Sequence, residues 1–98
     1  MNSIAIVDGK TINKEVDFYI QVSDQIDFVV GFGKNYHAFK DRLESDLERP
    51  IRIILKNHSS SKEKLGDTFL LIIETMKEIQ EKDEKRNHEN ERFTFSLE

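Results

Sequence analysis

The sequence predicts an α/β fold in which three parallel strands form a sheet flanked by helices. Three short apolar runs, at residues 3–7, 51–55 and 93–97, have the composition of strands. The long connections between these runs carry helical patterns, and parallel strands need crossover connections of this kind. The fold class therefore follows from the apolar runs together with the segments that separate them.

The three predicted strands differ in their expected burial. Residues 3–7 are mostly apolar and are closed by the turn pair Asp8-Gly9. Residues 51–55 are β-branched and apolar enough for a central strand that is buried on both faces. Residues 93–97 alternate apolar and polar side chains, which is the period of a half-buried strand.

A first helix is predicted to begin after Asn13, which can cap it, and to end near Gln25. Glu15 and Asp17 would lie in its first turn, where acidic side chains favour the positive end of the helix dipole. One side of this helix is predicted at helical spacing from Val16, Tyr19, Ile20 and Ser23.

A long helix is predicted over residues 68–82. Its apolar run at residues 69–73 could also form a strand, but the apolar spacing continues in helical steps beyond that run. The residues at these steps are Leu65, Phe69, Ile72, Met76 and Ile79. Such a wide apolar face predicts packing against both the sheet and a neighbouring helix. A short helical stretch at residues 62–65, ended by Gly66, precedes it, and the charged residues 81–92 are predicted to form an exposed loop.

Residues 31–50 combine a glycine turn with an amphipathic helix. Asn35 can cap that helix, which should begin at about Tyr36, and Pro50 prevents it from continuing. The predicted core side holds Tyr36, Phe39, Leu43 and Leu47. The predicted solvent side holds His37, Ala38, Asp41, Ser45 and Glu48.

Composition limits the class of protein. A length of 98 residues suits one domain over residues 1–98, and the absence of cysteine excludes disulfides and thiolate metal sites. The amino-terminal stretch has neither a basic leader nor a long apolar run, so we expect a cytoplasmic, soluble protein. The net charge of −4 disfavours a nucleic-acid-binding role and fits a basic protein partner better.

The segment at residues 31–43, followed by Pro50, resembles the recognition loop and helix of the barstar family, the intracellular ribonuclease inhibitors. The family pattern runs aromatic, Gly, any residue, Asn, apolar, polar, Ala, apolar, any residue, Asp, any residue, Leu, and this chain matches it without a gap. The resemblance implies a barstar-like fold and a protein that blocks the active site of a ribonuclease or ribonuclease-like toxin, as an immunity protein. It implies no catalytic activity and no cofactor or metal, and a monomer when free that forms a heterodimer with its target.

The resemblance also implies which residues contact the target. The matching positions are Gly31, Phe32, Gly33, Asn35, His37, Ala38, Asp41, Glu44, Ser45 and Thr75. Asp41 would enter the ribonuclease active site, where its carboxylate takes the place of a substrate phosphate. This chain departs from the family at three positions: His37 and Thr75 stand where acidic residues are usual, and Lys40 replaces an aromatic residue. These departures point to a target other than barnase.

Other functions are compatible with the sequence. A barstar-fold adaptor without nuclease binding is one alternative, and a small nucleotide-binding protein is another. For the latter, residues 31–35 resemble a phosphate cradle but lack the Gly-X4-Gly-Lys-Ser/Thr spacing. His37 and Asp41 have the spacing of a metal pair, yet a third ligand is not evident. Residues 26–30 have strand propensity, whereas the resemblance implies an extended approach to the recognition loop.

Overall fold

The protein is described here by a computed structural model, which covers residues 3–26, 35–46, 50–86 and 92–98. Its sheet has three parallel strands in the order β1 (Ser3–Asp8), β2 (Ile51–Lys56) and β3 (Phe93–Leu97). The central strand β2 pairs with both others, so that Ala5, Ile53 and Phe95 lie side by side across the sheet. The predicted fold class is confirmed.

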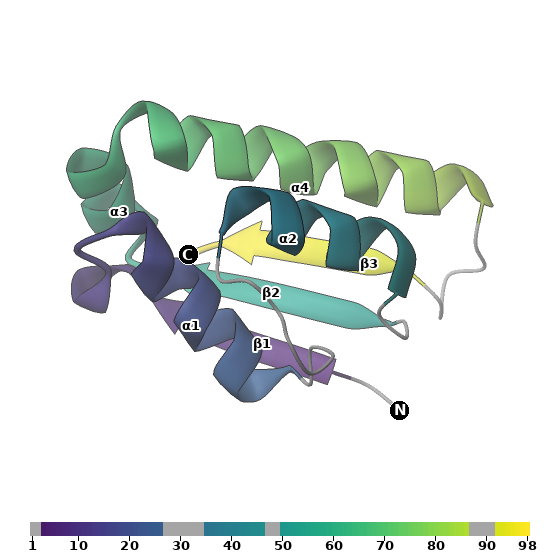
Figure 1. Ribbon diagram of the computed structural model, residues 1–98, viewed down its shortest axis with the longest axis horizontal. Helices are drawn as coiled ribbons and strands as arrows, with labels where there is room; N and C mark the ends of the chain where they lie inside the picture. Colours follow the sequence, from purple (N-terminus) through teal and green to yellow (C-terminus); the bar gives the residue numbers. More distant parts are fainter. Residues whose placement is uncertain (1–2, 27–34, 47–49, 87–91) are drawn as a thin grey trace.

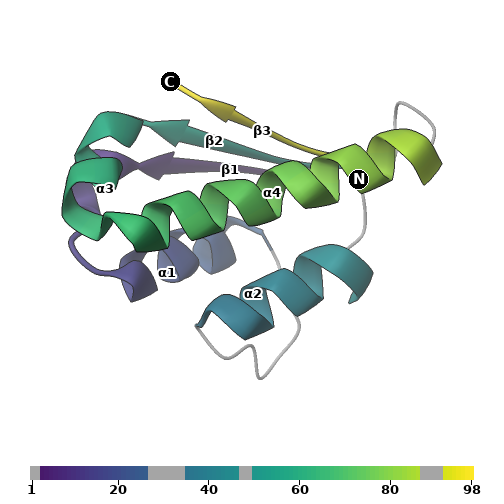
Figure 2. The same cartoon turned by 90° about the horizontal axis from the view of Figure 1, so that it is seen from above.

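Helical segments occupy the two long connections. They are the 3-10 turn η1 (Gly9–Thr11), α1 (Glu15–Gln25), α2 (Tyr36–Asp41), the π-helical turn η2 (Arg42–Asp46), α3 (His58–Leu65) and α4 (Asp67–Arg86). Figure 1 shows the sheet behind these helices, and the turned view in Figure 2 shows α1, α4 and α2 on the same side of it. In that view α2 lies farthest from the strands, as an outer layer over α1 and α4.

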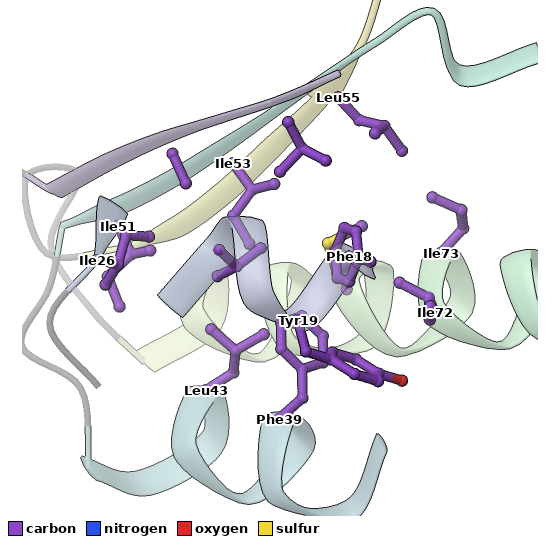
Figure 3. Packing of buried hydrophobic residues seen from close by; sticks show 14 of the residues in the cluster. Phe18, Tyr19, Ile26, Phe39, Leu43, Ile51, Ile53, Leu55, Ile72 and Ile73 are labelled. Carbon is purple, nitrogen blue, oxygen red and sulfur yellow. The ribbon is translucent and has the colours of Figure 1, made fainter. Parts of the chain in front are cut away.

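The core fills the space between the sheet and these helices. Figure 3 shows Ile51, Ile53 and Leu55 of β2 pointing toward α1 and α4, with Phe39 of α2 and Leu43 of η2 closing the far side. All five of these side chains are at most 1% exposed. The apolar runs that predicted the strands therefore supply one wall of the core, and the amphipathic helices supply the other.

The second face of the sheet is open to solvent. Along β2, Ile51, Ile53 and Leu55 are buried, whereas Arg52 and Lys56 are exposed. On β1 the outward side chains Ile4 and Ile6 are 51% and 47% exposed. The prediction that the central strand is buried on both faces is wrong, because a β-branched run identifies a strand without fixing how many of its faces are covered.

The free edge of β1 is closed by side chains of α1. The Gln25 amide accepts a hydrogen bond from the Ile6 N–H at 2.8 Å and donates one to the Ile6 carbonyl at 2.7 Å, as a neighbouring strand would. Gln21 Oε1 accepts from the Asp8 N–H at 3.0 Å. Since unpaired edge groups favour association with other chains, these two glutamines also protect the edge.

The same bonds help to set which side of α1 faces the core. The buried residues of α1 are Phe18, Tyr19 and Val22, while Val16 and Ile20 are 36% and 37% exposed. Both sides of this helix are apolar enough to be buried. The glutamines that reach β1 hold the helix in this rotation, and of the four residues grouped by helical spacing only Tyr19 is buried.

The start of α1 also differs from the prediction, although its end at Gln25 is confirmed. Its N-cap residue is Lys14, and the Asp17 carboxylate accepts from the N–H groups of Asn13 and Lys14 at 2.9 and 3.0 Å. These two bonds lower the pKa of Asp17. Asn13 does not cap the helix; its side chain accepts from Lys64 Nζ at 3.1 Å.

The free edge of β3 is closed by side chains of α4. Asp83 Oδ2 accepts from the Phe93 N–H at 2.7 Å, and Gln80 Oε1 accepts from the Phe95 N–H at 3.1 Å. Asp83 is only 6% exposed although it lies within a charged stretch. The prediction of a loop at residues 81–92 is therefore wrong for residues 81–86, because the bond to β3 requires α4 to extend past Asp83.

The turn at the carboxyl ends of the strands is tightly packed. A Cβ atom added to Gly9 would lie 2.2 Å from the Asn57 carbonyl oxygen and 2.5 Å from Ser61 Oγ, so only glycine fits there. Asn57 has a positive φ of 53° and leads directly into α3, which begins earlier than the predicted stretch at residues 62–65. Gly66, with φ 56°, ends α3 as predicted.

Replacement of Asp83 tests the edge contact of β3. Asp83→Ala leaves a buried N–H without its acceptor, so we expect the free energy of unfolding to fall by roughly 1.5 to 3 kcal/mol. The exposed neighbour Glu84 provides the control, and Glu84→Ala should change stability by less than about 0.5 kcal/mol. Urea denaturation of both variants gives the comparison, and equal midpoints would show that the contact adds no stability.

Candidate partner-binding site

Local sequence determines where α2 begins. Asn35 Oδ1 accepts from the Ala38 N–H at 2.9 Å, and the Asn35 carbonyl accepts from the Phe39 N–H at 3.0 Å. This is the capping arrangement in which a side chain satisfies one of the free amides of the first turn. The predicted cap and the predicted start at Tyr36 are both confirmed.

Aromatic packing fixes α2 on α1. The Phe39 ring meets the Phe18 ring edge to face, with centroids 5.3 Å apart, and it lies 5.4 Å from the Tyr19 ring. Figure 3 shows Phe39 of α2 and Leu43 of η2 directed toward α1 and the sheet, and both are 0% exposed. Phe39 and Leu43 therefore form the predicted core side, while the predicted Leu47 lies outside the described residues.

A hydrogen bond fixes the start of α2 on α4. The hydroxyl groups of Tyr36 and Thr75 are 2.6 Å apart, and Thr75 is only 3% exposed. Thr75, predicted to contact a partner, thus lies beneath Tyr36 with its hydroxyl already engaged. The periodicity placed Tyr36 on the inner side of its helix but gave no sign of this bond, because Thr75 is far away in sequence.

The outer side of α2 carries the exposed polar residues. Asn35, His37 and Asp41 are exposed, Ala38 is partly exposed, and the His37 ring packs edge to face on Tyr36 with centroids 5.5 Å apart. The structure therefore brings these four predicted contact residues together on one helix and its cap.

The helix changes geometry directly after Asp41. Residues 42–46 form a π-helical turn, and Glu44 within it is exposed. Lys40 Nζ lies 4.0 Å from Glu44 Oε1, and about a third of each side chain is exposed. An exposed ion pair of this kind contributes little to stability. Asp41 and Glu44 each contribute a carboxylate to the α2 surface, which is the exposed side of α2 and of the turn that follows it.

Several predicted contact residues lie outside the described part of the chain. Gly31, Phe32 and Gly33 belong to residues 27–34, and of Ser45 only the backbone is described. Their roles remain predictions, as do the alternatives for residues 26–30 beyond the buried Ile26.

Two kinds of site are absent from the described residues. Among them, no group of three or more His, Cys, Asp or Glu side chains lies where it could hold a metal ion. Within the same ranges, no helix combines the length and the apolar character needed to cross a membrane. The chemistry of the α2 surface is that of solvent-exposed carboxylates and an imidazole on a firmly packed helix.

A double-mutant cycle tests the bond that joins α2 to α4. Tyr36→Phe and Thr75→Val each remove one hydroxyl with little change of shape, so each should lower stability by about 0.5 to 1.5 kcal/mol. Because the two groups bond each other, the double variant should lose clearly less than the sum of the single losses. Chemical denaturation measures all four proteins, and strictly additive losses would mean that the hydroxyls are not coupled.

The chain is similar in sequence to proteins of one known family. Residues 2–98 match the sequence model of the family described as Barstar (barnase inhibitor). The chain is also similar to a protein of Bacillus subtilis (strain 168) named "Putative ribonuclease inhibitor YrdF", at 31% identity over 76 residues. That alignment covers 78% of this chain and 84% of the relative. Because the family match extends over nearly the whole chain, the protein belongs to the barstar family.

Proposed function

We propose that this protein inhibits a ribonuclease by placing the outer side of α2, with the loop before it, over the active site of the enzyme. The family description and the name of the Bacillus subtilis relative both support an inhibitor of this kind. The observation that carries the proposal is the construction of α2, whose inner side chains are fixed on α1 and α4 while Asp41 faces solvent.

The carboxylate of Asp41 provides the chemistry of inhibition. A ribonuclease active site holds a phosphate of RNA with cationic side chains, and a carboxylate can accept the same charge-assisted hydrogen bonds. When the complex excludes water from such a contact, one residue can dominate the affinity. Asp41 reaches the partner without first leaving a buried position, since it is exposed in the free protein.

The target is proposed to be a basic ribonuclease or ribonuclease-type toxin other than barnase, met in the cytoplasm and bound as a heterodimer. His37 and Thr75 replace acidic residues of the family pattern, and Lys40 is paired with Glu44. The α2 surface therefore presents fewer carboxylates than that pattern does. We therefore expect the proposed ribonuclease to have fewer cationic side chains around the group that binds Asp41 than a target of the usual family pattern has.

Replacement of Asp41 tests the proposal directly. Asp41→Ala should weaken binding by at least about 2 kcal/mol, or some thirtyfold, mainly through faster dissociation. Its stability should change by no more than about 1 kcal/mol, because the residue is exposed and alanine favours helices. The measurement is binding and inhibition across a panel of purified basic bacterial ribonucleases that includes barnase, together with melting curves.

Two matched carboxylates serve as controls. Glu44→Gln, at the paired rim position, should cost under about 1 kcal/mol of binding, and Asp24→Ala, an exposed acid on α1, should have no effect. Full inhibition by a stably folded Asp41→Ala would show that α2 is not the inhibitory element. Failure of the wild-type protein to bind any ribonuclease of the panel would contradict the proposed function itself.

The charge of the protein gives a second prediction. Because the chain carries a net charge of −4 and the proposed partner is basic, attraction at long range should accelerate association. We expect the association rate to fall at least about tenfold as salt rises from about 0.05 to 0.5 M, while dissociation changes less. Stopped-flow kinetics provides both rates, and an association rate independent of salt would rule out this steering.

A further inference from the structure

Two adjacent leucines of α4 are exposed in the free protein. Leu70 is 48% exposed and Leu71 is 43% exposed, although the residues that follow them, Ile72 and Ile73, are buried. The two leucines are alike in type and exposure, so they differ mainly in the direction they face. That direction decides which of them can reach a partner bound on α2.

The bond between Tyr36 and Thr75 fixes these directions. Thr75 faces α2, because its hydroxyl is 2.6 Å from that of Tyr36. Leu71 lies one helical turn before Thr75 and therefore on the same side of α4. Each residue of an α-helix advances by about 100°, so Leu70 lies about 140° around α4 from Thr75. Leu70 therefore faces away from α2.

Leu71 thus extends the α2 surface onto α4. Tyr36 spans the two helices, and the His37 ring packs against it on the solvent side. Leu71 therefore places apolar surface on α4 about one turn away from the point where Tyr36 meets that helix. The surface then has an acidic part around Asp41 and an apolar part that ends at Leu71.

We propose that Leu71 is the contact residue of α4, and that the ribonuclease places an apolar side chain opposite it. This inference rests on the proposed function. Thr75 offers no charge and little surface to a partner, because it is 3% exposed and bonded to Tyr36. Recognition on the α4 side therefore depends on burial of Leu71 by the ribonuclease. The cationic side chains of the ribonuclease bind at Asp41 instead.

A charge introduced at Leu71 distinguishes an apolar from a basic group on the partner. Leu71→Glu should weaken binding more than tenfold, because the carboxylate would lose water without gaining a cation. Leu71→Ala should weaken binding about three- to tenfold through lost burial. The matched variants Leu70→Glu and Leu70→Ala face away from the partner and should bind within about twofold of the wild type.

The experiment measures dissociation constants of these four variants and of Asp41→Ala, with the ribonuclease of the panel that the wild type binds most tightly. Melting temperatures confirm that each variant is folded. Tighter or unchanged binding by Leu71→Glu would overturn the inference, as would equal losses at Leu70 and Leu71. If Asp41→Ala still weakens binding in that case, the proposed function stands. If Asp41→Ala has no effect, the proposed function fails instead.

Discussion

Every open parallel sheet has two free edges, and the rest of this fold depends on how those edges are satisfied. Gln25 pairs with both backbone groups of Ile6 on β1, and Asp83 accepts from the Phe93 N–H on β3. These contacts fix α1 against one edge and α4 against the other. They also determine which side of each helix faces the core, as the buried and exposed residues of α1 show.

The position of α2 follows from that of its two supporting helices. Phe39 packs on the Phe18 ring of α1, and Tyr36 bonds Thr75 of α4, so α2 rests on both. A surface that is already ordered loses little conformational entropy when a partner binds. The polar contacts of the sheet edges therefore contribute indirectly to binding, because they hold the helices on which the α2 surface is built.

Local patterns in the sequence predicted the three strands, the helical state of residues 69–73, and the cap and start of α2. Each of these depends on neighbouring residues, whose spacing is visible in the chain. The missed features depend on partners distant in sequence. The sequence of α1 does not show which of its apolar sides is buried, because this depends on the hydrogen bonds of Gln21 and Gln25 to β1. The charged stretch that contains Asp83 likewise does not show that Asp83 is buried against β3.

In the candidate site, too, the features set by neighbouring residues could be predicted, and those set by residues distant in sequence could not. Asn35, His37, Ala38 and Asp41 lie together because they share one helix and its cap. Thr75 is predicted only from its place in the family pattern, and the structure shows that it is buried and bonded to Tyr36. The π-helical turn after Asp41 was also not predicted, since no residue type in residues 42–46 indicates it.

The uncovered face of the sheet affects how two copies of the protein could associate in solution. Bare apolar sheets tend to stack face to face, and Ile4 and Ile6 provide such a surface here. The central strand, however, presents Arg52 and Lys56 on either side of Ile54. Stacking of β2 on β2 of another copy, in either direction, would bring like charges together, at a cost of about 4 kcal/mol for a close pair near a protein surface. The two cations of the central strand therefore oppose stacking of this face on the same face of another copy.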